Sequence, residues 1–302
     1  MTVSQTVVSI GHGFLEGPRW RDGRLYASDF FARTVLTFDG DGVRDVVCEV
    51  PGQPSGLGWS PDGVLHVVSM LDRRLLRLEN GELTELADLS GLFPWHANDL
   101  IVDGSGRSYV GNFGWDEGTV DTIAATVIAR VDPDGSVSTA ATDLVFPNGM
   151  AITPDGATFL VAETFAARVT AFTIGDDGSL SDRRVWADFA DGATFPTLTE
   201  AMASGAVLPD GIALHADGTL WVADAARQGV LRVAQGGEVL QRIGFGTRTA
   251  FAVAVGGPAA DTLYACVAAP YRSANPSLDW QASLVRVDLD PVMADDAVWA
   301  GR

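Results

Sequence analysis

The chain repeats one pattern of polar turn and apolar strand six times. Each copy has a turn rich in Asp and Gly, followed by a short apolar segment that usually contains an aromatic side chain. The copies occupy residues 21–29, 61–69, 104–112, 154–163, 216–224 and 259–266. Their spacing of roughly 40 to 60 residues is typical of the four-stranded blade of a β-propeller.

A second short segment follows each copy and alternates apolar residues with Arg or Thr. These segments lie at 34–38, 74–78, 127–131, 168–172, 229–233 and 283–287. Such alternation predicts a strand with one face in a core. Two linked strand patterns in six copies predict an all-β fold, a six-bladed β-propeller that spans residues 1–302 as a single domain.

The ends of the chain indicate how the ring closes. Most blades continue into a fourth, outer strand, such as that expected at 43–50, but residues 288–302 contain no comparable segment. The apolar segment Thr6–Ile10 is available to fill this place. We therefore expect an N-terminal strand to complete the sixth blade, because a closed ring leaves no open sheet edge.

The interval between the fourth and fifth copies is the longest. It includes residues 191–208, whose composition gives no sign of a domain boundary. Within it, residues 199–204 predict a short helix on a loop at one end of the ring.

Composition and charge narrow the classes of function. The net charge is −19, and all 20 basic residues are arginine. A strongly acidic chain repels phosphate backbones, so we expect no nucleic-acid partner. No apolar run approaches the roughly 20 residues that span a bilayer, and we expect no membrane contact. The N-terminus lacks the pattern of a signal peptide, so we expect a cytoplasmic protein in which Cys48 and Cys266 are free thiols.

Polar residues recur at one phase of the repeat, at the start of each innermost strand. The aligned pairs are Glu16-Gly17, Ser55-Gly56, Asn98-Asp99, Asn148-Gly149 and Asp210-Gly211. Equivalent positions on innermost strands lie around the axis of a propeller, so these side chains should converge. Asn-Gly and Asp-Gly are also common turn pairs, which is the alternative interpretation.

A convergent set of this kind suits a hard divalent cation. Glu16, Asn98, Asn148 and Asp210 offer only oxygen ligands, and two carboxylates balance a charge of +2. We expect one divalent metal ion, with Ca²⁺ preferred and Zn²⁺, Mn²⁺, Mg²⁺ and Fe²⁺ as alternatives.

The same motifs resemble the senescence marker protein-30/gluconolactonase family, also called regucalcin-like. The resemblance covers nearly the whole chain and rests on four segments, which are Glu16–Trp20, Ala97–Leu100, Pro147–Gly156 and Pro209–Ala213. It implies that Glu16, Asn148 and Asp210 bind the metal directly. It also implies that Asn98 lies beside the metal and contacts the substrate or a water.

One position departs from the family pattern. The sugar lactonases of the family carry an arginine two residues before the Asn-Asp pair, where this chain has His96. Histidine offers fewer donors for sugar hydroxyls than arginine does. Phe113 and Trp115 flank the same motif and could line an apolar pocket with His96 and Asp99, although packing between blades would also explain aromatic residues there.

These observations favour a metal-dependent hydrolase that opens a small lactone or ester, with a sugar-type lactone as the expected substrate. The metal would act as a Lewis acid and Asp210 as the general base. No serine-hydrolase elbow or zincin motif is present. The alternatives are a related propeller enzyme such as a phosphotriesterase, isomerase or lyase, and a propeller that binds calcium or a ligand without catalysis. We expect a monomer or a small homo-oligomer.

Overall fold

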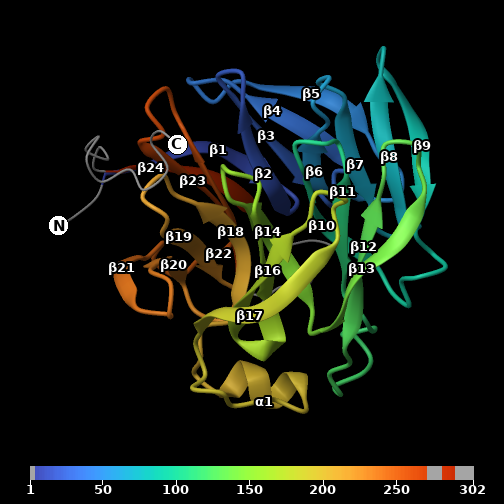
Figure 1. The fold of residues 1–302 in the computed structure, drawn as a ribbon. Coiled ribbons are helices and arrows are strands. Elements are labelled where there is room, and N and C mark those ends of the chain that lie inside the picture. The colour runs from blue at the N-terminus through green and yellow to red at the C-terminus, as the bar shows by residue number, and fades with distance from the viewer. Residues whose placement is uncertain (1–3, 271–280, 290–302) are drawn as a thin grey trace.

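Six antiparallel sheets of four strands form the ring that the repeats predict (Figure 1). The computed structural model describes residues 4–270 and 281–289, and these counts refer to that part of the chain. Each innermost strand contacts the innermost strand of the next blade, and that of the sixth blade contacts that of the first. The architecture is therefore a six-bladed β-propeller, as predicted.

The first three blades follow one another along the chain, each written here from its innermost to its outermost strand. Blade 1 contains β2 (Leu15–Arg21), β3 (Arg24–Asp29), β4 (Thr34–Phe38) and β5 (Arg44–Glu49). Blade 2 contains β6 (Pro54–Trp59), β7 (Leu65–Ser69), β8 (Arg74–Glu79) and β9 (Glu82–Asp88). Blade 3 contains β10 (Ala97–Val102), β11 (Ser108–Asn112), β12 (Thr126–Val131) and β13 (Val137–Leu144).

The other three blades repeat this order, and the sixth takes its outer strand from the N-terminus. Blade 4 contains β14 (Pro147–Ile152), β15 (Thr158–Glu163), β16 (Arg168–Ile174) and β17 (Leu180–Asp188), with the short helix η1 (Thr164–Ala166) after β15. Blade 5 contains β18 (Pro209–Leu214), β19 (Leu220–Asp224), β20 (Gly229–Val233) and β21 (Val239–Ile243), and α1 (Leu198–Ala203) precedes it. Blade 6 contains β22 (Thr249–Gly256), β23 (Thr262–Ala268), β24 (Ala282–Asp288) and β1 (Gln5–His12).

The N-terminal strand closes the ring as expected. β1 pairs antiparallel with β24, so that Val7 lies opposite Val285 and Ile10 opposite Ser283. The sixth sheet thus joins the two ends of the chain, which ties the first blade to the last. The expectation that the C-terminal tail adds no strand concerns residues 290–302, which lie outside the described residues.

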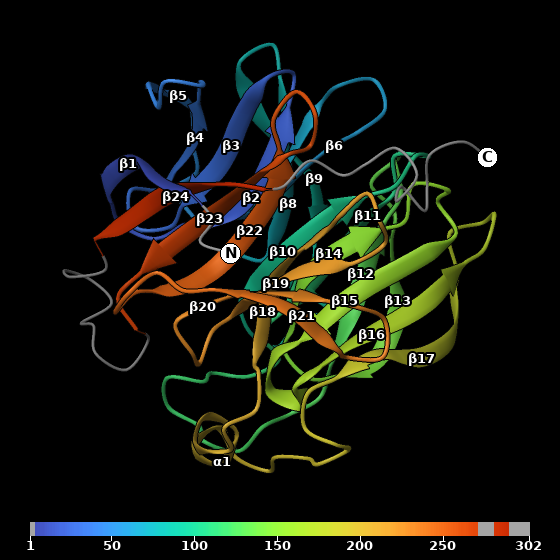
Figure 2. The same ribbon diagram turned by 90° about the vertical axis from the view of Figure 1, so that its left-hand side faces the viewer.

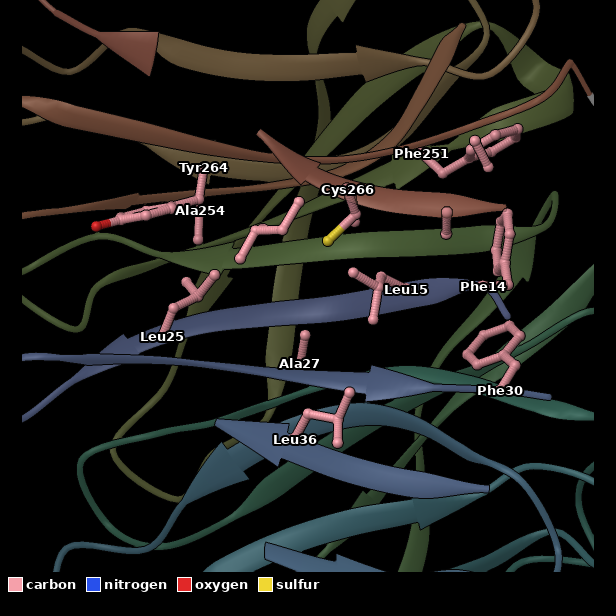
Figure 3. Close-up of a cluster of buried hydrophobic side chains, with 14 of the residues drawn as sticks. Phe14, Leu15, Leu25, Ala27, Phe30, Leu36, Phe251, Ala254, Tyr264 and Cys266 are labelled. Atoms are coloured by element: carbon pink, nitrogen blue, oxygen red, sulfur yellow. The ribbon is translucent and has the colours of Figure 1, made fainter. Parts of the chain in front are cut away.

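The core is divided among the interfaces between neighbouring blades. Within the described residues, six clusters of buried apolar side chains each lie mainly between one pair of adjacent blades. Figure 3 shows the cluster between blades 6 and 1, where Leu15 and Leu25 face Cys266 and Tyr264. Cys266 is buried, and both it and Cys48 are free thiols, as predicted.

The two ends of the ring differ in their connections. At the face of the ring where each innermost strand finishes, tight turns connect the strands. In the β2–β3 turn, Asp22 and Gly23 both have positive φ, the pattern of a type I′ turn. The opposite end, called the site end below, carries the long connections 113–125 and 189–208, and α1 projects there beyond the strands (Figures 1 and 2). No helix in the described part of the chain could cross a membrane.

Carboxylates at the ends of second strands hold the site end together. Asp29 closes β3, and its carboxylate accepts hydrogen bonds from the backbone N–H groups of Gly13, Phe14 and Ala32 at 3.0, 3.1 and 3.2 Å. Asp224 accepts a bond from the N–H of Leu208 in the same way in blade 5. These bonds fix the residues that lead into the innermost strands, so they determine where those strands begin.

Replacing Asp29 tests this role. Asp29→Ala should lower the free energy of unfolding by about 1–3 kcal/mol at pH 7, because buried N–H groups lose their acceptor. Burial alone would raise the pKa of Asp29, but the nearby ring of His12 and the hydrogen bonds from the backbone outweigh it and lower the pKa. Ionised Asp29 therefore stabilises the fold above the pKa of about 3.9 that the group has in the unfolded chain. This stabilisation is lost as the pH falls below that value.

Denaturant unfolding between pH 3 and pH 7 measures this effect. The exposed Asp41, in the β4–β5 turn at the opposite end of the blade, provides the control, and Asp41→Ala should change the stability by less than about 0.5 kcal/mol. Equal stability of the two variants would show that Asp29 does not hold the loop.

Candidate metal centre

The five aligned polar residues occupy the same place in five blades. Each is the second residue of an innermost strand, and Ala250 takes this place in blade 6. The set consists of Glu16 in β2, Ser55 in β6, Asn98 in β10, Asn148 in β14 and Asp210 in β18. Because the innermost strands form a closed ring, the structure brings these side chains to the site end around one axis.

The glycines that follow them have a packing role. A Cβ atom at Gly56 would lie 2.2 Å from the backbone nitrogen of Leu100, and one at Gly149 would lie 2.4 Å from that of Ile212. A Cβ atom at Gly211 would lie 2.6 Å from the Cα of Ala252. The alternative interpretation of these pairs as turns is therefore wrong, because they lie within strands whose close approach leaves no space for a side chain.

Hydrogen bonds orient the two amides of the set. The Nδ2 of Asn148 donates to the Oγ1 of Thr164 at 3.3 Å, and this hydroxyl donates to the carbonyl of Pro209 at 2.8 Å. Asn148 also lies close enough to Asp210 to lower the pKa of that carboxyl group, against the rise caused by burial. The Oδ1 of Asn148 accepts no hydrogen bond from any described residue, and Asn148 retains an exposed fraction of 7%. Its amide oxygen is thus the atom left for a ligand.

The amide of Asn98 is held on both sides. Its Nδ2 donates to the carbonyl of Pro147 at 3.4 Å, and its Oδ1 accepts a bond from the Oγ of Ser55 at 3.4 Å. Asn98 therefore links blades 2, 3 and 4 at the level of the other polar residues. Its position beside Asn148 agrees with the proximity expected from the sequence.

Three carboxyl groups at this end repel one another. Burial raises the pKa of Glu16 to about 8, and the neighbouring Asp99 adds to the rise. Burial, followed by the charges of Glu16 and Asp99, raises the pKa of Asp210 well above its usual value. The pKa of Asp99 is raised by burial and opposed by Arg19. Carboxylates in this environment are costly without a cation, so the donor set fits a bound cation.

The side-chain types limit how such a cation could be held. The described residues contain no group of three or more His, Cys, Asp and Glu side chains that could hold a metal ion. Two carboxylates, from Glu16 and Asp210, would therefore need the amide oxygen of Asn148 as a further ligand. Oxygen ligands of this mixed kind are those that Ca²⁺ takes in proteins.

Arg19 and Asp99 form an ion pair that sequence analysis did not identify. The Nη2 of Arg19 donates to the Oδ1 of Asp99 at 3.1 Å and to the carbonyl of Leu100 at 2.7 Å. The pair joins blade 1 to blade 3, and Gly56 of blade 2 lies next to it. Arg19 lies within the segment Glu16–Trp20 that carries the family resemblance, but nothing in its spacing indicates a partner 80 residues away.

The aromatic residues expected near the site gather on blades 3 and 4. His96 stacks on Trp95 at 4.5 Å and meets the edge of Phe113 at 5.8 Å between ring centroids. Trp115 is 7% exposed and donates through Nε1 to the carbonyl of Val120. Burial lowers the pKa of His96, so its ring is neutral near pH 7. Trp115 supports the cluster from within, whereas His96 and Phe113 remain partly exposed.

Two of the long connections at the site end are bonded to each other. The carbonyl of Asp121 accepts a bond from the N–H of Leu198 at 2.8 Å, and its Oδ1 accepts one from the N–H of Thr199 at 2.9 Å. The N–H of Ile123 donates to the carbonyl of Pro196. Asp121 thus fastens the loop of blade 3 to the start of α1 (Figure 2).

Comparisons with known proteins agree with the fold and the motifs. Residues 14–269 match the family described as the SMP-30/Gluconolactonase/LRE-like region. A pentonolactonase of Haloferax volcanii is 30% identical over 273 residues, which are 89% of this chain and 86% of that protein. A solved gluconolactonase of Xanthomonas campestris has a TM-score of 0.71 at 25% identity, covering 95% of this chain and 90% of that chain. A solved calcium-binding protein, regucalcin, of Agrobacterium tumefaciens has a TM-score of 0.74 at 20% identity, covering 96% and 97%.

Proposed function

We propose that this chain, which belongs to the SMP-30/gluconolactonase/LRE-like family, is a metal-dependent hydrolase that opens a small lactone or ester. The observation that carries the proposal is the placement of Glu16, Asn148 and Asp210 at matching positions of three innermost strands. The pentonolactonase and the gluconolactonase to which the chain is similar favour a sugar-type lactone as the starting point for substrate tests.

In this proposal, Glu16, Asn148 and Asp210 hold one divalent cation. When bound, the cation supplies Lewis-acid chemistry to a carbonyl oxygen and lowers the pKa of water. The oxygen donor set favours Ca²⁺ over the softer alternatives, and Zn²⁺, Mn²⁺, Mg²⁺ and Fe²⁺ remain to be compared. The likeness in fold to a calcium-binding regucalcin supports a divalent metal.

Side chains of the protein carry out proton transfer and bind the substrate. The carboxylate of Asp210 accepts a proton from the water that attacks the carbonyl carbon, and the ring oxygen leaves and is protonated, so that lactone and water give one hydroxy acid. The neighbouring Asn148 lowers the pKa of Asp210, which favours the carboxylate form that this transfer needs. Asn98 orients the substrate. The Oδ1 of Asp99 is bonded to Arg19 and Leu100, which leaves its Oδ2 to contact the substrate.

A hydrolysis assay on the metal-loaded protein tests the proposal. D-glucono-1,5-lactone, an alkyl-substituted lactone and a phosphotriester are compared, each against its spontaneous hydrolysis. We expect at least one lactone to open above the spontaneous rate and the phosphotriester to remain intact. Turnover of the phosphotriester alone would assign different chemistry to the site. Metal binding without any turnover would indicate a binding protein.

A further inference from the structure

Two positions in every blade lie at the site end, next to the proposed metal ligands. The first is the residue that precedes the innermost strand, and the six residues there are Phe14, Gln53, His96, Phe146, Leu208 and Arg248. The second is the residue that follows the second strand, and these six are Phe30, Met70, Phe113, Thr164, Ala225 and Ala269. Because the two strands pair antiparallel, both sets lie at one end, and we call these twelve residues the collar.

Eight of the twelve collar residues are apolar, and the side chains of six of them pack together. Phe14 lies 5.4 Å from Phe30 and 4.9 Å from Phe251 of β22, measured between ring centroids (Figure 3). Phe30 and Met70 belong to the same buried cluster, and Phe113 packs against it. Apolar packing thus continues from blade 6 through blades 1 and 2 to blade 3, and Phe14, Phe30 and Met70 are buried within it.

The collar continues into blade 4 through further aromatic contacts. Phe113 lies 4.7 Å from Phe146, and Phe146 lies 4.8 Å from Phe165. His96 adds its ring to Phe113 at 5.8 Å. Phe113 therefore contacts both the apolar side chains of blades 6, 1 and 2 and the aromatic side chains of blades 3 and 4. It is also partly exposed, so its ring is accessible to a bound molecule.

Two of the four polar members of the collar, Thr164 and Arg248, are bonded within the protein, whereas the partly exposed side chains of Gln53 and His96 form no hydrogen bond with any described residue. Thr164 accepts its bond from Asn148 and donates to Pro209. The Nη2 of Arg248 donates to the backbone carbonyls of Val267 and Gln281 in its own blade. A substrate with a hydroxyl group on every carbon would therefore find only these two collar side chains as partners, and a hydroxyl that loses water without gaining a partner weakens binding.

We infer that the collar selects lactones that carry an apolar alkyl or aryl substituent over lactones that are hydroxylated on every carbon. This inference rests on the proposed function, because it names the substrate class for the same site. The ester group lies among Asn98, Asn148 and Asp210, and the substituent packs against Phe113 and its neighbours. Apolar area removed from water on binding favours such a substrate, and each additional buried methylene strengthens the preference.

Relative rates test the inference. The kcat/KM of the metal-loaded protein is measured for δ-decanolactone and for D-glucono-1,5-lactone, each divided by its spontaneous rate of hydrolysis. We expect δ-decanolactone to be favoured at least about tenfold. An equal or higher normalised value for the gluconolactone would overturn the inference while leaving the proposed function intact.

Two variants connect this preference to the collar. Phe113→Ser should lower kcat/KM for δ-decanolactone about tenfold more than it lowers kcat/KM for the gluconolactone. His96→Arg should raise kcat/KM for the gluconolactone roughly ten- to a hundredfold, because it adds charge-assisted donors at the collar. Trp59→Ser is the matched control, since Trp59 is a partly buried aromatic residue at the far end of β6. An unchanged preference in both collar variants would contradict the inference.

Binding of the hydroxy acid products separates this inference from the reaction itself. Calorimetry compares 5-hydroxydecanoate with gluconate on the same protein, without turnover. Tighter binding of 5-hydroxydecanoate supports the collar even if neither lactone is opened, in which case only the proposed function fails. Tighter binding of gluconate would overturn the inference whatever the rates are.

Discussion

Asp210→Asn should lower kcat for lactone opening by about 10²–10⁴-fold, the range found when a general base is removed. Asparagine keeps the shape of the side chain and one oxygen, but it cannot take a proton from water. The substitution also removes a carboxyl group whose pKa is raised by burial and by Glu16, so the fold should not lose stability. Steady-state kinetics and thermal unfolding measure the two effects.

A matched control separates this effect from a general loss of acidic charge. Asp155 lies in an exposed turn at the opposite end of blade 4, and Asp155→Asn should leave kcat unchanged. Wild-type turnover by Asp210→Asn would show that another group is the base. Asp210→Asn should also weaken metal binding, so kcat is measured at saturating Ca²⁺, and recovery of the wild-type kcat there would assign Asp210 to metal binding alone.

Glu16→Gln should weaken the affinity for Ca²⁺ by about a hundredfold, because the site loses one of its two negative ligands. In the metal-free protein the same change should be neutral or stabilising above pH 8. Burial raises the pKa of Glu16 to about 8, so ionised Glu16 destabilises the fold at higher pH, and glutamine never ionises.

Calorimetry with Ca²⁺ and thermal unfolding with and without the ion measure these effects. Binding to the folded state should raise the melting temperature of the wild type and raise it much less for Glu16→Gln. Glu82→Gln, on the outer strand β9, is the control that should retain wild-type affinity. If Glu16→Gln bound Ca²⁺ as tightly as the wild type, Glu16 would not be a ligand.

The repeats were sufficient to predict most of the fold. Alternation and Asp-Gly turns are local signals, so the strand predicted at 168–172 lies within β16 (Arg168–Ile174), and the helix predicted at 199–204 overlaps α1 (Leu198–Ala203). Closure by an N-terminal strand followed from the missing outer strand of blade 6, and β1 confirms it. That residues 1–302 form one domain stays a prediction.

The candidate site was predictable in position but not in its supporting contacts. Aligning the repeats was enough to place Glu16, Asn148 and Asp210 together, because residues at equivalent positions of the repeat lie near one another around the axis of the ring. Arg19 and Thr164 could not be found in this way. Their roles depend on partners in other blades, Asp99 and Pro209, and such contacts follow from how the blades pack rather than from any local pattern.

The collar was foreseen only in part for the same reason. His96, Phe113 and Trp115 were expected near the substrate because they flank one motif. Phe146 is separated from Phe113 in sequence and joins it only through the packing of blades 3 and 4. The ligand roles of Glu16, Asn148 and Asp210, and the substrate contacts of Asn98, His96, Asp99, Phe113 and Trp115, stay predictions.

A titration of the metal-free protein tests metal-dependent hydrolysis most directly. Protein treated with a chelator is titrated with Ca²⁺, and in parallel with Mn²⁺, Mg²⁺, Zn²⁺ and Fe²⁺, while the rate of lactone opening is recorded. We predict no turnover before addition and a rate that rises to a plateau at one equivalent of the preferred ion. Full turnover by the metal-free protein would contradict the account. So would a plateau in the rate that is reached without an ion bound at Glu16, Asn148 and Asp210.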